Sequence, residues 1–211
     1  MIGGTQVIIR KLLKEKYKDE KVFIVPIQTV QHVNDKFTYS KHDNNIWQKY
    51  DNLGRYVFRY EAEGEPSMQQ IIPYFMVFNE DESKVFVAKR IDGDHRLLDK
   101  MSLGFGGHID ECDGYSQCVL KALTREMWEE LDIEPLTKAT YMGTIRDITS
   151  STNDHFGLVF CVKALEGSVS IKEVDKLVGE WMTFEELFDN YSKFENWSKY
   201  IIDYFYEIKG K

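Results

Sequence analysis

The segment 106–133 constrains the fold of this chain most strongly, because a glycine-rich loop in it leads into a helix with two different faces. Apolar residues recur at helical spacing within residues 116–131, which predicts a helix with one side packed in a core. Positions i, i+3 and i+4 on another side carry carboxylates, at Glu126, Glu129 and Glu130. We therefore expect a packed helix that presents an acidic surface.

Three like charges on one side of a helix destabilise it by roughly 0.2–0.5 kcal/mol per pair unless a cation or solvent compensates. Carboxylate oxygens on a rigid helix suit Mg²⁺, which keeps several waters and also binds phosphate oxygens. Glutamate-rich helix faces are common and most are merely solvated, so the spacing alone favours solvent. Two neighbouring features favour a metal instead: Gly106 and Gly107 lead into the helix, and Arg125 directly precedes the first glutamate. Arg125 is placed to pair with a nearby carboxylate and fix its orientation.

This pattern resembles the signature of the Nudix hydrolases, Gly-x5-Glu-x7-Arg-Glu-U-x-Glu-Glu-x-Gly-U, where U is a bulky apolar residue. The chain matches the second half of the signature at Arg125, Glu126, Met127, Glu129, Glu130 and Ile133. The sequence Gly106-Gly107-His108 is similar to the glycine loop that opens the signature. More loosely, the resemblance extends over residues 71–188.

The resemblance implies an α/β fold, namely a Nudix-type α/β/α sandwich around a mixed β-sheet, formed by residues 70–211. Residues 1–69 are then an N-terminal extension of uncertain structure. Extensions and loops of this kind often determine which substrate an enzyme accepts, so we expect substrate specificity to depend on this segment.

The resemblance also implies a metal site, in which Mg²⁺, or alternatively Mn²⁺, is bound by Glu126, Glu129, Glu130 and the carbonyl of Gly107. Arg125 would orient Glu126, so the implied catalytic residues are Arg125, Glu126 and Glu129, although the general base varies within the family. The implied reaction is attack of water on a small-molecule diphosphate, either a nucleoside diphosphate linked to another moiety or a related organic pyrophosphate. A cation assists such a reaction by lowering the pKa of water and by neutralising charge on the phosphoryl oxygens.

The loop between the glycines and the helix departs from the signature. Arg125 follows Gly107 by 18 positions (125 − 107), against 14 in the family, so the loop holds about four additional residues. Without a gap, the first glutamate of the signature falls on Gln117, which is not a carboxylate. Glu111 and Asp113 are the acidic alternatives within the lengthened loop.

Three further residues are candidates for binding the substrate: His108 beside the glycines, His155 before a predicted strand, and Arg90 after another. For His108, a hydrogen bond with the backbone is an equal alternative. Charged residues at strand ends, such as Arg90, are more usually solvated.

The remainder of the chain predicts alternating strands and helices, as in a layered α/β protein. The expected strands are residues 21–30, 71–78, 85–89, 140–146, 157–163 and 180–183, and residues 197–206 form a final amphipathic helix. The second and third of these strands form a hairpin. Thr183 and Glu186 have the spacing of a capping box. Asp132 replaces the late glycine of the signature, and we expect it to end the 116–131 helix in a left-handed conformation.

Composition limits the partners and the location. The chain has 211 residues and a formal charge of −8, and such an acidic chain repels duplex nucleic acid on average. No run of about 18 apolar residues is present, so no membrane span is expected. Residues 1–21 lack the apolar core of a secretory signal, and the three cysteines form no CxxC pair, so we expect a cytoplasmic protein with reduced thiols. A homodimer is compatible with the sequence.

Three alternatives to a hydrolase remain. A ligand-sensing Nudix domain without turnover would explain why Gln117 replaces a carboxylate. An isomerase acting on a prenyl diphosphate would need a cysteine in a reactive context, and none of the cysteines has one. A plain interaction domain would use the glutamates only as a solvated surface.

Overall fold

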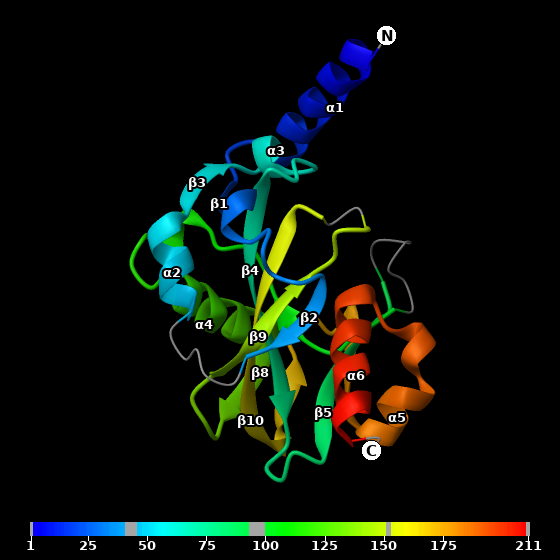
Figure 1. Cartoon of the computed structure of the whole chain (residues 1–211). Helices are drawn as coiled ribbons and strands as arrows, with labels where there is room; N and C mark the ends of the chain where they lie inside the picture. Colours follow the sequence, from blue (N-terminus) through cyan, green and yellow to red (C-terminus); the bar gives the residue numbers. More distant parts are fainter. Residues whose placement is uncertain (1, 41–45, 93–99, 151–152, 210–211) are drawn as a thin grey trace.

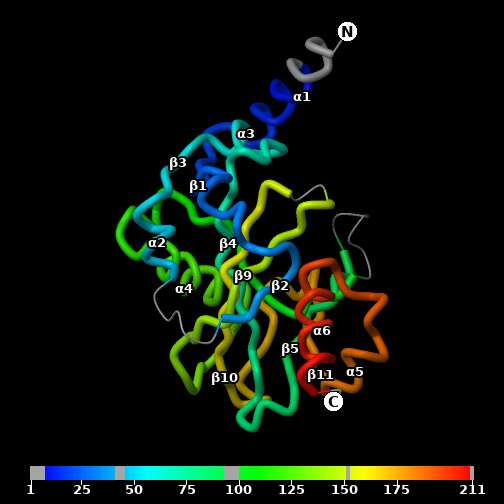
Figure 2. The backbone as a smooth tube through the Cα atoms, viewed as in Figure 1, coloured from blue at the N-terminus to red at the C-terminus, as the bar shows by residue number. Residues whose placement is uncertain are grey.

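The computed structural model describes residues 2–40, 46–92, 100–150 and 153–209 (Figures 1 and 2). The strands of these residues are β1 Lys21–Pro26, β2 Lys36–Tyr39, β3 Arg55–Phe58, β4 Met68–Phe78, β5 Lys84–Arg90, β6 Met101–Ser102, β7 Phe105–Gly106, β8 Leu131–Pro135, β9 Thr140–Arg146, β10 His155–Ile171 and β11 Leu177–Thr183. The helices are α1 Ile2–Tyr17, α2 Ile46–Leu53, α3 Arg59–Ala62, α4 Cys118–Glu130, α5 Phe184–Asp189 and α6 Asn196–Lys209, with 3₁₀ turns at η1 Ile27–Thr29, η2 Glu111–Asp113 and η3 Tyr191–Lys193.

The strands form a mixed sheet whose main path is β11-β5-β4-β10-β9-β2. At its centre β4 and β10 run parallel, from Gln70 paired with His155 to Phe78 paired with Lys163. The other strand pairs of the described residues are antiparallel. The expected hairpin of residues 71–78 and 85–89 is confirmed as β4 and β5, and the expected strands near the C-terminal half correspond to β9, β10 and β11.

Helices cover both faces of the sheet, which confirms the α/β/α sandwich (Figure 1). Because successive side chains of a strand point to opposite faces, Phe75 and Val77 of β4 pack in the core under α4 and α2. Met76 and Phe78 of the same strand pack in the second core, under α5 and α6. A central strand that is covered on both faces is apolar along its whole length, as residues 71–78 are.

The segment that precedes β4 contributes strands to this sheet. β1 pairs with β3 and β4, and β2 pairs with β9, so β1 and β2 are joined directly to strands of the following domain. The strand expected over residues 21–30 ends at Pro26, and η1 follows it. α1 contacts α3 and extends away from the rest of the molecule (Figure 1).

Both ends of α4 differ in detail from the sequence-based expectation. At its start Asp51 of α2 acts as the cap, since its Oδ1 accepts the N–H of Val119 at 3.2 Å. At its end Leu131 is already extended, with φ −122° and ψ 143°, and α4 continues directly into β8. The expectation that Asp132 is left-handed is wrong, because Asp132 pairs with Ser170 of β10 as an ordinary strand residue.

Candidate active site

Two glycines bring the loop after β7 into close contact with β4 and α4. Gly106 has a φ of 150° and pairs with Tyr74, and a Cβ at Gly106 would lie 2.1 Å from the carbonyl oxygen of Pro73. A Cβ at Gly107 would lie 2.5 Å from Oε1 of Glu126. A side chain at Gly106 would therefore displace the backbone of β4, and a side chain at Gly107 would displace the Glu126 carboxylate.

Arg125 connects the glycine loop to the acidic side of α4. Its Nη1 lies 2.7 Å from Oε1 of Glu126 and 3.0 Å from Oε2 of Glu129. Its Nη2 donates to the carbonyl oxygen of His108 at 2.8 Å. On its other side Nε and Nη2 donate to Oδ1 and Oδ2 of Asp113 at 3.2 and 3.0 Å, a two-pronged pairing that fixes the guanidinium plane.

The lengthened loop is what places Asp113 against this arginine. It folds into η2, whose capping box joins Asp110 and Asp113, and Oδ2 of Asp113 accepts the N–H of Asp110 at 3.0 Å. Asp113 is only 3% exposed, whereas Glu111 and Gln117 are both exposed. Of the three positions considered for the first glutamate of the signature, Asp113 is thus the one that contacts Arg125.

Burial sets the electrostatics of the glutamates. It raises the pKa of Glu126 against the opposing effect of Arg125. Burial, together with the charge of Glu126, raises the pKa of Glu130 to about 7, although the backbone N–H of Gly106 donates to Glu130. A nearby cation would stabilise the ionised forms of the buried Glu126 and the half-buried Glu130, whose protonation is favoured in this way.

The three glutamates are less convergent than their spacing predicts. Their ligand atoms do not form a group within 4.8 Å of one another, because the Glu129 side chain is exposed and turned towards Arg125. Among the described residues, the group that meets this distance is Asp110, Cys112 and Asp113. The guanidinium of Arg125 already pairs with this group, since Nη2 lies 3.0 Å from Asp113 and 4.0 Å from Asp110. The negative charge of the two aspartates is therefore compensated without a metal.

The donors around Gly107 nevertheless fit a divalent cation. Glu126 and Glu130 offer hard carboxylate oxygens. The Glu126 carboxylate lies so close to the backbone of Gly107 that no side chain fits between them. A cavity of about 630 Å³ opens onto Gly107, Glu126 and Glu130. These are the features that a cation bound by carboxylates, backbone oxygen and water requires.

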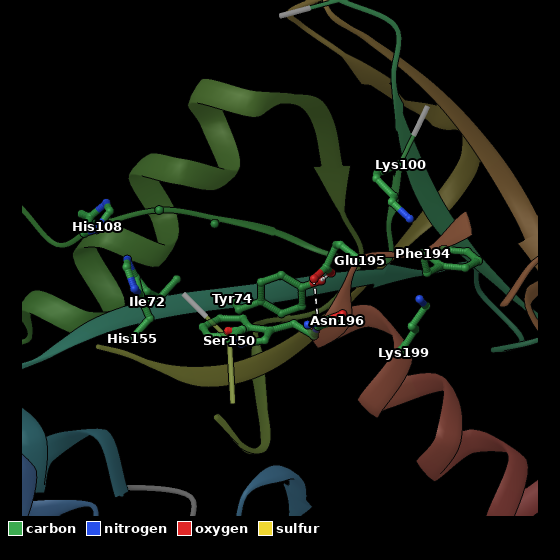
Figure 3. A pocket seen from close by; sticks show the side chains of 13 residues that line it. Ile72, Tyr74, Lys100, His108, Ser150, His155, Phe194, Glu195, Asn196 and Lys199 are labelled. Carbon is green, nitrogen blue, oxygen red and sulfur yellow. Dashed lines mark hydrogen bonds between the residues drawn. The ribbon is translucent and has the colours of Figure 1, made fainter. Parts of the chain in front are cut away.

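A second cavity, of about 520 Å³, lies on the other side of the glycine loop (Figure 3). It is lined by Gly106 and Gly107, by His108 and His155, and by residues of β4 and α6. The rings of His108 and His155 meet edge to face, with centroids 5.3 Å apart. Burial lowers the pKa of His108 to about 3, so this ring is neutral, and its Nε2 has no hydrogen-bond partner among the described residues.

His155 is oriented from behind by a buried aspartate. Nδ1 of His155 lies 2.7 Å from Oδ1 of Asp154, which is 1% exposed. The other oxygen of Asp154 accepts the N–H of Gly64 at 2.7 Å and Nε2 of Gln70 at 3.1 Å. Because Asp154 holds Nδ1, the other ring nitrogen of His155, Nε2, is the one available to the cavity.

Arg90 stands at the end of β5, on the side of the site occupied by Glu130. Both residues line a third cavity, of about 230 Å³, together with Lys100 and Glu195. The charge of Arg90 acts to lower the pKa of Glu130. The structure therefore brings all of the sequence-based candidates to one region: Arg90, Gly107, His108, Arg125, Glu126, Glu129 and Glu130 around the glycine loop, with His155 beside His108.

Sequence reasoning did not identify several residues that line the 520 Å³ cavity, among them Tyr74, Lys100, Trp197 and Lys199. Tyr74 belongs to the apolar run of residues 71–78, and the α6 residues belong to an ordinary amphipathic pattern. No local pattern distinguishes them, because they meet only when α6, β4 and the segment before β6 come together in the folded protein.

Comparison with known proteins identifies the family. The family model described as the NUDIX domain matches residues 68–205, and the chain belongs to this family. Protein YmaB of Bacillus subtilis (strain 168) is 33% identical over 201 residues, which cover 88% of this chain and 97% of YmaB. The crystal structure of Tm1382, a protein proposed to be a Nudix hydrolase, superposes with a TM-score of 0.76 at 26% identity and covers 90% of this chain and 100% of Tm1382.

The two relatives also bear on the segment before residue 70. Coverage of 88% and 90% exceeds the share that residues 70–211 alone would give, so both similarities extend into the N-terminal segment. In the described part of the chain, no helix has the length and apolar character needed to cross a membrane.

Proposed function

We propose that this protein is a hydrolase that depends on Mg²⁺, or alternatively Mn²⁺, and cleaves the diphosphate of a small molecule. The substrate class is a nucleoside diphosphate linked to another moiety, or a related organic pyrophosphate. The observation that supports this proposal best is the contact between Gly107 and the Glu126 carboxylate, which Arg125 and Asp113 hold in place. Family membership supports the hydrolase class as a whole.

In this proposal Glu126 and Glu130 hold the cation, with Glu129 and the carbonyl of Gly107 as further ligands. A bound cation would lower the pKa of a water and neutralise charge on the phosphoryl oxygens. Arg125 keeps the Glu126 carboxylate in one orientation, and Asp113 keeps Arg125 in place. Glu129 is exposed and is the candidate general base, for which it must leave Nη1 of Arg125.

The remaining candidates bind the substrate. Arg90 lies beside Glu130 and is placed to pair with a phosphate oxygen. His108 and His155 line the 520 Å³ cavity at the glycine loop and present ring nitrogens to the part of the substrate next to the diphosphate. As part of the same proposal, the protein acts in the cytoplasm with its three cysteines free.

Two observations favour a hydrolase over its rivals. A sensor was considered because Gln117 replaces a carboxylate, but Asp113 supplies a carboxylate to Arg125 from the lengthened loop. A cysteine-dependent isomerase is disfavoured because the hydrogen bond with Asp110 and burial raise the pKa of Cys112, the cysteine that lines the 630 Å³ cavity, and no described residue lining the 520 Å³ cavity is a cysteine. The interaction-domain alternative predicts no effect of Mg²⁺ on any substrate.

The decisive experiment is a phosphate-release screen over nucleotide sugars, dinucleoside polyphosphates, NADH, ADP-ribose and nucleoside triphosphates, with Mg²⁺, Mn²⁺ or EDTA. We expect metal-dependent hydrolysis of at least one diphosphate, and a loss of about a hundredfold or more in kcat for Glu126→Gln or Glu130→Gln. Glu134→Gln, an exposed glutamate on β8, is the matched control and should retain wild-type turnover. Equal rates in the wild type and the site variants would overturn the proposal.

A further inference from the structure

One end of the 520 Å³ cavity carries two lysines that come from separate elements. Lys100 directly precedes β6, and Lys199 lies in the first turn of α6. In Figure 3 their side chains extend towards each other from opposite sides next to Phe194, while His108 and His155 lie at the other end of the view. The fold thus directs two ammonium groups to the end of the cavity that lies away from the histidines.

Neither lysine is explained by an ion pair or by helix stability. Within the described residues no salt bridge involves Lys100 or Lys199. Nζ of Lys199 lies over the ring of Tyr191, 5.8 Å from the ring centroid. A cation in the first turn of a helix is disfavoured by the helix dipole, typically by about 0.3–1 kcal/mol, so Lys199 does not serve the stability of α6.

The carboxylate that lines the same cavity is engaged elsewhere. Oε2 of Glu195 accepts the N–H of Trp197 at 2.7 Å, and Oε1 accepts the N–H of Ser198 at 2.8 Å. Glu195 therefore caps the N-terminus of α6, where the helix dipole balances its charge. Among the described residues that line this cavity, no carboxylate forms a salt bridge with either ammonium group.

Aromatic and apolar side chains line the same cavity. They are Ile72, Tyr74, Phe194 and Trp197, and the rings of Tyr74 and Trp197 meet edge to face with centroids 5.6 Å apart. Such a wall accommodates a flat ring, and its charged end accommodates an anion. A phosphate monoester carries a charge of about −1.5 to −2 at pH 7, which two ammonium groups match.

We propose that Lys100 and Lys199 form a subsite for a phosphate monoester carried by the substrate beyond its scissile diphosphate. This rests on the proposed function, because the diphosphate must lie beside Gly107 and Glu126 for the rest of the molecule to extend towards the lysines. The substrate class is then a nucleotide-linked diphosphate with an additional terminal phosphate, rather than one whose distal part is neutral.

The test uses pairs of compounds that differ by one phosphate monoester: NADH and NADPH, ADP-ribose and ADP-ribose 2′-phosphate, dephospho-coenzyme A and coenzyme A. We expect kcat/KM of the wild type to be about tenfold or more higher for the phosphorylated member of at least one pair, mainly through KM. In the double variant Lys100→Gln/Lys199→Gln the ratio within that pair should fall to about one. The control Lys138→Gln/Lys193→Gln removes the same charge from exposed positions outside the cavity and should keep the wild-type ratio.

A ratio near one in the wild type for every hydrolysed pair overturns the subsite. A ratio that persists in the double variant also overturns it, and a uniform loss for both members would assign the lysines to the scissile diphosphate instead. The same pairs are measured by calorimetry in EDTA, where no turnover occurs. If the wild type hydrolyses no pair, the proposed function fails for these substrates. Tighter binding of the phosphorylated member that is lost in the double variant still supports the subsite. Equal binding of the two members refutes it.

Discussion

Asp113 accepts hydrogen bonds from Arg125 with both of its carboxylate oxygens, at 3.2 Å from Nε and 3.0 Å from Nη2, although it lies 12 positions earlier in the chain. This pairing lets the remaining guanidinium nitrogen reach the carboxylate of Glu126 at 2.7 Å. The orientation of Glu126 is therefore set by an aspartate that does not touch it through a hydrogen bond.

Removing the aspartate should damage both stability and turnover. Loss of one partner of a buried ion pair costs about 3–5 kcal/mol, and Arg125 is partly exposed, so we expect Asp113→Ala to lower the free energy of unfolding by about 2 kcal/mol or more. Turnover should fall by at least about tenfold because Glu126 loses its fixed orientation. Denaturant unfolding and the phosphate-release assay measure the two effects. The control is Glu111→Gln, at an exposed position, which should change the free energy of unfolding by less than about 0.5 kcal/mol. An Asp113→Ala protein as stable and active as this control would contradict the role of Asp113.

Gly107→Ala should weaken cation binding more than it weakens folding. The added Cβ would lie 2.5 Å from Oε1 of Glu126, and a terminal carboxylate can move aside at little cost in packing. We expect a loss of about tenfold or more in affinity for Mn²⁺, measured by electron paramagnetic resonance, and an unfolding free energy within about 1 kcal/mol of the wild type. Gly167→Ala is the control, since a Cβ there has no neighbour within 4 Å. Unchanged Mn²⁺ affinity in Gly107→Ala would argue against Glu126 as a ligand.

Asp154 should make a contribution to stability that disappears in acid. Burial opposes ionisation of Asp154, but the hydrogen bonds from His155 and Gly64 outweigh it, and the pKa of Asp154 is lowered from 3.8. A carboxyl whose pKa is depressed in the folded state stabilises the protein above the unfolded value of 3.8, and this contribution is lost as the pH falls through the lower folded pKa. We expect Asp154→Asn to be less stable than the wild type at pH 7, by about 1–3 kcal/mol.

Unfolding by urea between pH 3 and 7 measures this dependence. The difference between Asp154→Asn and the wild type should shrink below about pH 4. Asp189→Asn, at an exposed position, should track the wild type throughout. A difference of constant size across this range would show that the ionised form of Asp154 is not what stabilises the fold.

The segment before β4 should stabilise the helix that carries the site. Asp51 caps α4 by accepting the N–H of Val119, and it also accepts a hydrogen bond from Sγ of Cys118 at 2.9 Å. Loss of an N-cap costs about 0.5–2 kcal/mol, so we expect Asp51→Ala to lower the free energy of unfolding by that amount. Asp132→Ala, an exposed substitution at the opposite end of α4, should have a smaller effect. Equal effects of the two substitutions would mean that Asp51 is not a significant cap.

Several parts of the fold could be predicted from local sequence because local forces determine them. The apolar run of residues 71–78 indicated a strand covered on both faces, and β4 packs in both cores. The Thr183 and Glu186 capping box forms as expected, since it involves neighbouring residues only. The end of α4 could not be predicted in this way, because pairing of Asp132 with Ser170 of β10 overrides the turn preference of aspartate.

The sequence by itself determined the family, the α4 helix and the candidate ligands, because a short pattern of glycines, arginine and glutamates expresses both helical spacing and metal chemistry. Only the tertiary structure decided that Asp113, not Glu111 or Gln117, holds Arg125, and that the Glu129 side chain turns towards the arginine. It also decided that Lys100 and Lys199 face one cavity beside the glycine loop. The physical reason is that these relationships depend on where a folded loop and a packed helix place their side chains in space. Residue spacing along the chain carries no information about contacts between segments that meet only in the folded protein.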